Sequence, residues 1–366
     1  MSPGREAALD VDIVVNNHDY GRYVGEAVES ALAQTHPNVN VVVVDDGSTD
    51  DSREIIERYA DRAEILLKEQ GGQASAINAG FQRCRGDLVL FLDADDKLHP
   101  ETAARVAAAF AADERAVKVQ FRTEIIDANG KGTGIVKPLP HLPMPNGDLR
   151  RDELIRPFDI VWMATSANAF RRSALERILP VPERAYPKTG ADWYLVHLTA
   201  LLGDVRSLQE VSGYYRVHGG NSYEAAEPVL DLGRVRKAIS YTAATRPELL
   251  RLAGEIGLPR PRRILSTADV AYRMISLSVD PSGHPVAGET RIGLLRDSAR
   301  ALTRRTDISG AMKAMLGGWF LAMALAPRRL AARLAVPFLF PDTRVKLNLL
   351  LGRLHRRAPE PEREAA

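Results

Sequence analysis

The stretches VVVVDDGSTDDS (residues 41–52) and LVLFLDADD (residues 88–96) each run from apolar β-type residues straight into a cluster of acids. Carboxylates gathered at the carboxyl ends of buried parallel strands repel one another, so a fold tolerates them mainly where a cation, a ribose or a base compensates the charge. The two stretches therefore predict a sheet whose strand ends form a metal and nucleotide site.

Strands and helices alternate around these two stretches. Apolar runs of about five residues, separated by helical patterns, indicate βαβ units and a parallel sheet covered by helices on both faces. Strands are expected at residues 11–15, 39–44, 64–68 and 87–92. Helices are expected at residues 23–33, 51–59, 74–83 and 100–112. The pattern predicts an α/β fold with a mostly parallel, doubly wound central sheet.

The pattern loosens further along the chain. Short strands are expected at 117–121 and 123–126, a Gly/Pro-rich mobile loop at 129–147, strand-rich segments at 161–170 and 203–218, and a helix at 193–202. From about residue 227 the composition changes to Ala, Leu and Arg with helical spacing. We therefore expect a catalytic domain over residues 1–226 and a helical C-terminal region over residues 227–366.

Composition bounds the class of protein. The 366 residues are 45% hydrophobic and 26% charged, which suits one large core with a smaller appended unit. A net charge of +2 gives no argument for a nucleic-acid partner. Cys84 is the single cysteine, so an internal disulfide is excluded, and no catalytic Cys/His signature surrounds it. The polar start over residues 2–12 carries no signal-peptide pattern, so a cytoplasmic location is expected.

Six segments between residues 11 and 221 follow one another in a characteristic order: VDIVVNNHDYGRYVGEAVESALAQTHP, VVVVDDGSTDDS, GGQASAINAG, GDLVLFLDADD, GADWYL and YYRVHGGN. Together they resemble family 2 glycosyltransferases, whereas a short acidic triplet alone is a weak match. The resemblance implies the Rossmann-like GT-A fold. It also implies an inverting enzyme that moves a sugar from a UDP- or dTDP-sugar to a hydroxyl acceptor in cell-surface polysaccharide or glycolipid assembly.

The resemblance places a divalent cation at Asp93-Ala94-Asp95. Carboxylate oxygens are hard ligands that suit Mg²⁺ or Mn²⁺. Asp95 is expected to be the direct metal ligand, Asp93 to bind ribose or assist the metal, and Ala94 to line the donor site between them. The alternative is that Asp95 and Asp96 only open a turn before Pro100.

The nucleotide is expected at the ends of the first two strands. Asp45 matches the position that accepts a hydrogen bond from the base in the family, although an acid before a glycine is also a common turn former. Asn16, Asn17 and His18 would line the pocket, with a plain surface histidine as the alternative for His18. The family often carries other residues at His18 and Asp19, which leaves the choice of base open.

Two further motif positions have competing interpretations. Gly72 follows Gly71 at the start of the third helix, where the backbone can approach a ligand closely. Asn78 matches a donor-site Asn of the family, with helix packing as the alternative, and Ile77 stands where many relatives carry Arg. Ser48 and Asp51 have the spacing of a capping box, so some of the nearby acids can serve to start a helix.

By the same resemblance Asp192 is the catalytic base. A sugar hydroxyl is a poor nucleophile unless its proton is removed as it attacks, and a positioned carboxylate contributes roughly 10²- to 10⁴-fold. Asp192 also suits the N-cap of the helix at 193–202. Ala191 replaces a second acid that is frequent in the family. Trp193 would stack on a sugar ring or pack in the core.

Arg216 and His218 lie in the segment that the family places over the donor diphosphate. His218 is expected to touch the metal or a phosphate, and Arg216 to pair with phosphate charge. The alternative for both residues is a structural role.

The apolar run AMKAMLGGWFLAMALA at residues 311–326 is followed by many arginines. It is shorter than the roughly 20 residues that span a bilayer. It is expected either to lie in a membrane interface, with Trp319 and Phe320 at the headgroups, or to pack on the catalytic domain or a partner subunit. Peripheral contact with the inner face of the plasma membrane would suit a lipid-linked acceptor, and oligomerisation stays open.

Two other functions compete with transfer. A non-catalytic nucleotide-sugar-binding module of an assembly complex would need no base, so the joint presence of Asp93, Asp95 and Asp192 argues against it. A dinucleotide-dependent oxidoreductase is disfavoured because residues 16–21 read NNHDYG where a Gly-x-Gly-x-x-Gly turn is needed.

Overall fold

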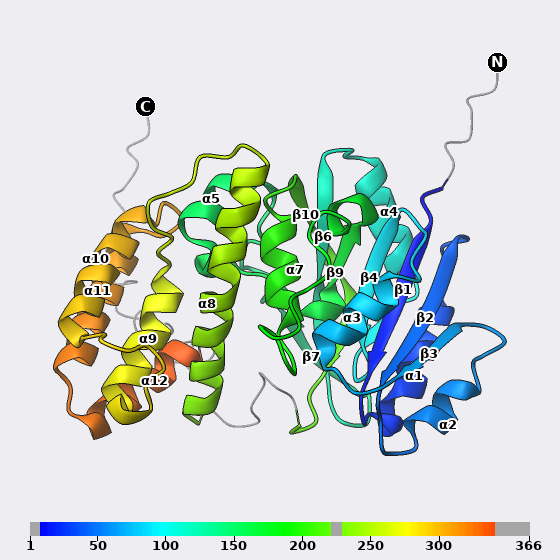
Figure 1. The fold of residues 1–366 in the computed structure, drawn as a ribbon, viewed down its shortest axis with the longest axis horizontal. Coiled ribbons are helices and arrows are strands. Elements are labelled where there is room, and N and C mark those ends of the chain that lie inside the picture. The colour runs from blue at the N-terminus through cyan, green and yellow to red at the C-terminus, as the bar shows by residue number, and fades with distance from the viewer. Residues whose placement is uncertain (1–7, 221–228, 341–366) are drawn as a thin grey trace, which may run out of the picture. The chain divides into compact units, whose positions relative to one another are not determined.

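The computed structural model describes residues 8–220 and 229–340. Within that range the chain forms two compact units (Figure 1). The first contains the described residues up to 220 together with residues 240–268, and the second contains residues 229–239 and 269–340. The first unit thus includes a segment that lies beyond the boundary expected at residue 226.

The first unit is built on a ten-stranded sheet, as far as the chain is described. Its main path runs β3-β2-β1-β4-β9-β6-β10-β5, with β7 paired to β6 and β8 paired to β10. The strands are β1 Val11–Asn17, β2 Val39–Asp46, β3 Glu64–Lys68, β4 Leu88–Asp93, β5 Lys97–Leu98, β6 Ala116–Ile126, β7 Gly132–Lys137, β8 Gly147–Asp148, β9 Asn168–Arg171 and β10 Asp204–Arg216. The expected doubly wound α/β fold is confirmed.

The sheet is parallel where the βαβ pattern is strongest. Strands β3, β2, β1 and β4 are mutually parallel, and β10 is parallel to β6. The short β9 runs antiparallel between β4 and β6, and β5, β7 and β8 are also antiparallel to their partners. These additions lie after residue 96, where the sequence pattern loosens.

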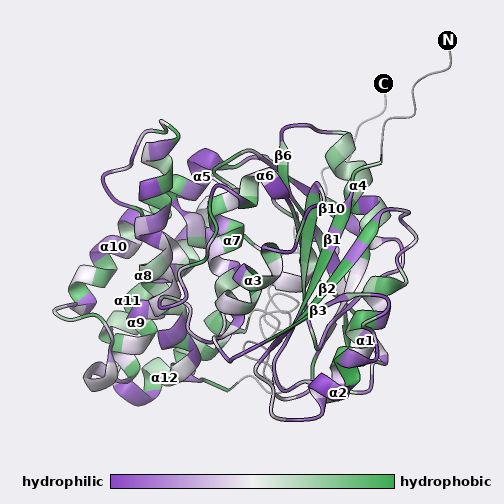
Figure 2. Cartoon of the chain, turned by 45° about the vertical axis from the view of Figure 1, so that its right-hand side comes forward, coloured by the Kyte–Doolittle hydropathy of each residue, from purple (hydrophilic) through white to green (hydrophobic). Residues whose placement is uncertain are grey.

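Helices cover both faces of the sheet because the central strands are hydrophobic on both sides (Figure 2). In β1, Ile13 and Val15 face one core and Val14 faces the other. The first core contains apolar residues of α1 Gly21–Leu32, α2 Ser52–Glu57 and α4 Thr102–Ala111. The second contains residues of α3 Gln73–Phe81, α7 Ala191–Thr199 and the part of α8 Leu232–Glu255 that belongs to the first unit.

The middle of the chain departs from the sequence prediction. The two short strands expected at 117–121 and 123–126 are one continuous strand, β6. The expected loop at 129–147 contains β7, which pairs back onto β6. In the segment 161–170, which was expected to be rich in strands, the strand is β9, which covers residues 168–171. The 3₁₀ turn Thr165–Ala167 precedes it. The remaining short elements of the first unit are α5 Arg150–Ile155, the 3₁₀ turn Pro157–Asp159 and α6 Arg172–Leu175.

The second unit is helical, as the Ala/Leu/Arg composition predicts. Besides the start of α8 it contains α9 Thr267–Val279 from residue 269 onward, α10 Arg291–Arg304, α11 Gly310–Leu325, α12 Arg328–Leu339 and the 3₁₀ turn Pro281–Gly283. Throughout the described ranges, no helix combines the length and the apolarity that crossing a membrane requires. Some of the arginines that follow the apolar run lie outside the described residues; these are Arg344, Arg353, Arg356 and Arg357.

Candidate active site

The predicted site residues of the two acidic stretches meet at the switch point of the sheet. Strand β1 pairs with β2 on one side and β4 on the other, so the strand order reverses there. Asn17 lies opposite Asp45 on β2, and Asn16 lies opposite Asp93 on β4. Open α/β sheets bind ligands outside the carboxyl ends of strands at such a point. The ends of β1, β2 and β4 therefore form one candidate site.

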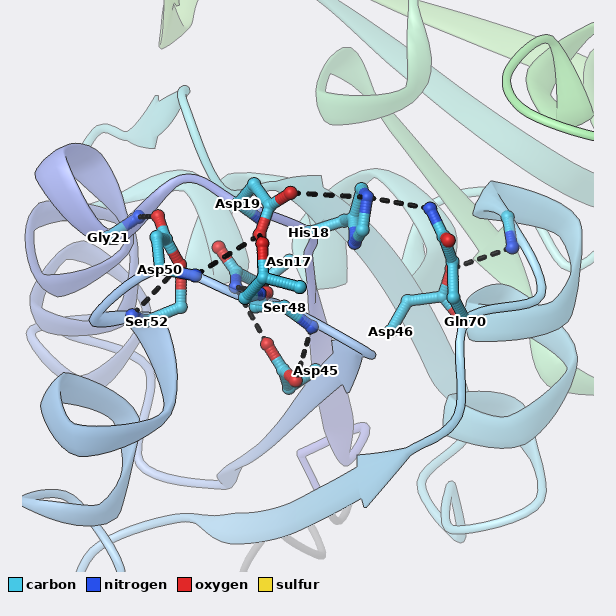
Figure 3. A network of polar contacts seen from close by, with 12 residues as sticks. Asn17, His18, Asp19, Gly21, Asp45, Asp46, Ser48, Asp50, Ser52 and Gln70 are labelled. Atoms are coloured by element: carbon cyan, nitrogen blue, oxygen red, sulfur yellow. Dashed lines mark hydrogen bonds and ion pairs between the residues drawn. The ribbon is translucent and has the colours of Figure 1, made fainter.

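Asp45 is fully buried at the end of β2 and is held by several donors (Figure 3). Asn17 Nδ2 donates to Asp45 Oδ2 at 3.0 Å, while Arg53 Nε and the Ser48 amide donate to Asp45 Oδ1 at 2.8 and 3.1 Å. Burial alone would raise the pKa of Asp45, but the hydrogen bonds from Ser48, Arg53 and Asn17 outweigh it and hold the pKa below its usual value. The carboxyl is thus an ionised acceptor.

Beside Asp45, the end of β1 carries buried polar atoms without partners. Among the described residues, Asn16 Oδ1 and Nδ2, Asn17 Oδ1 and His18 Nδ1 have no hydrogen-bond partner. Buried polar groups are nearly always hydrogen-bonded, so several orphaned atoms in consecutive residues point to a missing polar ligand. His18 Nε2 lies 2.8 Å from Gln70 Nε2, and the His18 side chain is only partly exposed, so the ring is part of this pocket.

The remaining acids of the first cluster hold the loops. Asp50 Oδ2 accepts from the Gly21 amide at 2.8 Å and Asp50 Oδ1 accepts from the Ser52 amide at 3.0 Å, so one carboxylate binds the first residues of α1 and α2. Ser48 Oγ accepts from Asn17 Nδ2 and from the Asp19 amide, and it does not form a capping box with Asp51 (Figure 3). These contacts fix the loop around Asp45.

Gly72 supplies backbone geometry at the start of α3. Its φ is 88°, and a Cβ there would lie 2.2 Å from the carbonyl oxygen of Pro187. Its amide donates to Asp46 Oδ2 at 2.6 Å, and the Gly71 amide donates to Asp46 Oδ1 at 2.9 Å. Asp46 therefore closes the loop, and Gly72 allows the close backbone approach that only a residue without a side chain permits.

Asp93 ends β4 in a strongly negative environment. Burial and the neighbouring charges of Asp95 and Asp192 raise the pKa of Asp93 to about 7. Hydrogen bonds oppose this shift only in part; Gln73 Nε2 donates to Asp93 Oδ1 at 3.1 Å. The buried Ala94 fixes the turn, since its amide donates to the Asn16 carbonyl at 3.0 Å. The structure thus gathers three carboxylates within electrostatic range.

His218 lies against Asp95, the residue expected to be the direct metal ligand. His218 Nε2 is 3.0 Å from Asp95 Oδ2, and the Gly220 amide donates to His218 Nδ1 at 3.3 Å. Because Nδ1 accepts, Nε2 carries the proton and donates to Asp95. The ring of Tyr20 meets the His218 ring edge-on at 5.5 Å.

Arg216 has a structural position beneath the acidic turn. Its side chain is fully buried, Nε donates to the Asp95 carbonyl at 2.7 Å, and a terminal nitrogen donates to Glu26 Oε2 at 3.0 Å. Its amide donates to Asp96 Oδ1 at 2.9 Å. These contacts favour the structural alternative over a phosphate contact, because the guanidinium holds the Asp95 carbonyl and the backbone amide holds the Asp96 carboxylate.

Gln73 joins the acidic turn to the helix that carries Asp192. While its Nε2 donates to Asp93, its Oε1 accepts from the amides of Gly190 and Ala191 at 2.9 and 3.2 Å. Helix α7 begins at Ala191, so Asp192 lies in its first turn and not at the N-cap. Asp192 Oδ1 accepts from the Trp193 amide at 2.9 Å, and an acid in the first turn interacts favourably with the helix dipole.

Two residues that were predicted to contact the donor make structural contacts instead. Asn78 is buried, its Nδ2 donates to the Val181 carbonyl at 3.0 Å, and its Oδ1 accepts from the Val181 amide at 2.7 Å. This pairing favours the packing alternative for Asn78. Trp193 packs against the core, with its ring 5.8 Å from Phe158 and 6.0 Å from Tyr241, which favours the core alternative.

A buried polar cluster supports α7. His197 Nδ1 lies 2.7 Å from Glu153 Oε1, and Trp162 Nε1 donates to the same oxygen at 2.9 Å. Lys118 Nζ sits 3.5 Å from the centroid of the Trp162 ring and has no hydrogen-bond partner among the described residues. Burial lowers the pKa of Lys118 and raises that of Glu153, so burial favours the neutral form of each side chain.

The donor set fits a cation that shares its ligands with a substrate. Within the described ranges, no three His, Cys, Asp or Glu side chains are grouped closely enough to hold a metal by themselves. Mg²⁺ usually takes one or two carboxylates and completes its shell with water and substrate phosphates. Asp93 and Asp95 match that mode, since burial and then the charges of Asp95 and Asp192 raise the pKa of Asp93, and a cation would offset those charges.

Two residues of the site escaped sequence reasoning. In the sequence, Gln73 is only the residue that follows the glycine pair. Its contacts with Gly190 and Ala191 join residues separated by 117 and 118 positions in the chain. Tyr20 lies near the acidic turn: burial, followed by the charges of Asp95 and Asp93, raises its pKa. No spacing rule points to either residue.

The fold and this arrangement at its switch point define a GT-A glycosyltransferase. The model of Glycosyl transferase family 2 matches residues 12–179. An uncharacterized glycosyltransferase of Nostoc sp. is 35% identical over 222 residues, which cover 60% of this chain and 68% of that protein. The chain belongs to glycosyl transferase family 2, and it is a glycosyltransferase.

Two other similarities complete the comparison. Undecaprenyl-phosphate 4-deoxy-4-formamido-L-arabinose transferase of Pseudomonas syringae is 43% identical over 83 residues, which cover 21% of this chain and 25% of that enzyme. The crystal structure of S. aureus TarS 1–349 in complex with UDP-GlcNAc superposes with a TM-score of 0.54 at 16% identity. That match covers 89% of this chain and 91% of the TarS fragment, and it supports the fold.

Proposed function

We propose that the protein transfers a sugar, with inversion, from a nucleotide-diphosphate donor to a hydroxyl acceptor. The observation that carries this proposal is the Gln73 side chain, which binds Asp93 with one end and the start of α7 with the other. It couples the acids suited to a donor diphosphate with Asp192, the carboxylate suited to act as base.

The nucleobase of the donor would occupy the pocket at the ends of β1 and β2. The unpartnered atoms of Asn16 and Asn17 offer donors and acceptors there, and Asp45 is an ionised acceptor beside them. A ring N–H of uracil or thymine is a suitable partner for that carboxylate, so a UDP- or dTDP-sugar fits the pocket. The UDP-GlcNAc complex of the structurally similar TarS supports this choice.

In the transfer step, the acceptor hydroxyl oxygen attacks the anomeric carbon and forms the new glycosidic bond. The bond from that carbon to the diphosphate oxygen breaks, and its electron pair leaves with the nucleoside diphosphate. The hydroxyl proton passes to the Asp192 carboxylate. One displacement on one face of the sugar inverts the anomeric centre.

A divalent cation, Mg²⁺ or Mn²⁺, bound by Asp95 with Asp93 would supply positive charge for the diphosphate. Among the chain's own residues, His218 orients Asp95 through Nε2, and Arg216 holds the backbone of the acidic turn. These two residues position the carboxylates and do not take part in the chemistry.

We place the acceptor among glycans or glycolipids of the cell surface, and the reaction at the inner face of the plasma membrane. The similarity to a transferase named for undecaprenyl phosphate supports a lipid-linked acceptor.

The assignment of Asp192 as the catalytic base is tested with Asp192→Asn. Asparagine keeps the shape of the side chain but cannot accept the proton, so we expect transfer to fall by roughly 10²-fold or more. Donor affinity, measured by calorimetry with Mn²⁺, should stay unchanged because the carboxylate does not hold the donor.

The matched control is Asp61→Asn, an exposed acid outside the site, which should leave the rate unchanged. Unimpaired turnover of Asp192→Asn would refute the assignment of the base. If the unmodified protein bound nucleotide sugars but neither transferred nor hydrolysed any member of a donor panel, the transfer proposal would be wrong.

The metal assignment is tested by removing divalent ions. Treatment with EDTA should abolish transfer, and added Mn²⁺ or Mg²⁺ should restore it, because the donor diphosphate then regains its counter-charge. Asp95→Ala should lose the donor-induced rise in Tm that Mn²⁺ confers on the unmodified protein. Full activity in EDTA would rule out metal dependence.

A further inference from the structure

Helix α11, Gly310–Leu325, is apolar around its whole circumference. Lys313 is the single charged residue in its 16 positions. A helix on the surface of a water-soluble domain usually carries polar residues on the face that points away from the core. The face of α11 that does not pack is therefore unusual.

Apart from the exposed Met312 near its start, the exposed apolar residues of α11 lie on one side of the helix. Phe320 and Met323 are buried, and they share one side of the helix with Leu316 and Lys313. The opposite side is exposed and follows a helical repeat of three and four residues. Its exposed residues are Ala311, Ala314, Met315, Gly318, Leu321, Ala322 and Leu325. Met315, Leu321 and Leu325 are 46%, 48% and 76% exposed, so this outer stripe is a real apolar surface.

The aromatic residues of α11 are not part of the outer stripe. Phe320 is fully buried, while the Trp319 ring stacks on Phe338 at 4.6 Å and donates from Nε1 to the Leu334 carbonyl at 2.9 Å. The expectation that Trp319 and Phe320 lie at lipid headgroups is therefore wrong. Trp319 packs on Phe338 of α12, and the Phe320 ring meets the Trp319 ring edge-on at 5.0 Å.

Basic residues adjoin the end of the outer stripe. Helix α12, Arg328–Leu339, begins three residues after Leu325 and exposes Arg328, Arg329 and Arg333. Residues 310–339 contain no acid. None of these three arginines has an ion-pair partner in the part of the chain that the structure describes, so their charge is directed to solvent.

We propose that the outer stripe of α11 and the arginines of α12 dock on an anionic lipid bilayer. A helix of 16 residues is about 24 Å long, shorter than the hydrocarbon core of about 30 Å, so α11 would lie in the plane of the interface. The apolar side chains enter the acyl region and the arginines meet anionic headgroups. Unpaired arginines beside an uninterrupted apolar stripe favour lipid over a second copy, whose identical surface would bring like charges together.

The test is co-sedimentation of the full chain with vesicles, without donor or metal. We expect binding to vesicles of equal parts phosphatidylcholine and phosphatidylglycerol and little binding to phosphatidylcholine alone. The triple variant Met315→Gln, Leu321→Gln, Leu325→Gln should bind at least about tenfold more weakly. The variant Arg328→Gln, Arg329→Gln, Arg333→Gln should lose roughly 10²-fold and lose the preference for anionic lipid.

A matched triple variant, Leu67→Gln, Ile135→Gln, Val161→Gln, changes exposed apolar residues of the first unit and should bind like the unmodified chain. Equal binding of all variants, or no binding of the unmodified chain, overturns the proposal. A dimer by light scattering that dissociates in the α11 variant would assign the stripe to a second copy. Donor hydrolysis without vesicles should be the same in every variant, so this test is independent of the proposed transfer reaction.

Discussion

The carboxyl groups of Asp45 and Asp93, at the ends of the two strands that flank β1, have pKa values shifted in opposite directions. Hydrogen bonds hold the pKa of Asp45 below its usual value against the effect of burial, whereas burial, Asp95 and Asp192 raise the pKa of Asp93 to about 7. The protein satisfies the first charge with its own donors. Hydrogen bonds compensate the second charge only in part, which is the setting expected of a carboxylate that binds a cation.

Asp45→Asn should be less stable at about pH 7, by about 1–3 kcal/mol in the free energy of unfolding, because Arg53 and Ser48 lose a charged acceptor. The folded-state pKa of Asp45 lies below its unfolded value, so its stabilisation is present above the unfolded pKa and is lost as the pH falls through the folded pKa. The difference between the two proteins should therefore shrink on acidification. Urea unfolding at several pH values measures it.

Asp61→Asn is the control, since Asp61 is exposed and lies outside the loop around Asp45. A stability difference for Asp45→Asn that stays constant down to about pH 3 would show that the ionised carboxyl is not the source of the effect.

Single residues could be predicted where a motif and a strand end coincide. Asn16, Asn17, Asp45 and Asp93 lie together because strand register alone brings them together. The burial of Arg216 could not be predicted, since it depends on Glu26, 190 positions away.

At the scale of elements, the start of α3 determines how the site is assembled. The positive φ of Gly72 turns the chain into α3, and Gln73 then reaches both β4 and α7. Three elements from separate parts of the sequence are thus joined by one amide side chain.

Gln73→Ala should lower kcat by about tenfold to a hundredfold, because a small displacement of α7 moves Asp192 relative to the reacting centre. Donor affinity should change little. Gln82→Ala, at the exposed C-cap of the same helix, is the matched control. Steady-state kinetics with a defined acceptor separate kcat from KM, and an unchanged kcat in Gln73→Ala would contradict the coupling.

Elements with one clear period were predictable, and elements with mixed signals were not. The strand Glu64–Lys68 has the expected limits because turns flank it on both sides. Strand β7 was missed because glycines and a proline at 132–138 resemble a loop, although pairing with β6 makes them a strand. Tertiary hydrogen bonds there override local propensity.

At the scale of the whole molecule, the proposed donor site consists of residues of the first unit. Hydrogen exchange should therefore slow on addition of UDP-sugar and Mn²⁺ at residues 16–21, 45–50, 93–96 and 190–193. Residues 269–340 should exchange as before. Mass spectrometry of peptic fragments resolves these segments, and equal protection across both units would contradict a site confined to the first.

The general architecture followed from the alternation of strands and helices, but the grouping of residues 240–268 with the sheet unit did not. Residues 240–255 continue the same helix as residues 232–239, so nothing in the sequence pattern indicates which turns of α8 pack on the sheet.

The strand order β3-β2-β1-β4 also has a consequence for biosynthesis. These four strands come from residues 11–93, so each can pair before the ribosome has added the second half of the chain. Domains commonly begin to fold from the N-terminus during synthesis. The nascent chain can thus assemble the pocket around Asp45 while Asp192 is still to be translated, and the proposed catalytic base joins a pocket that already exists.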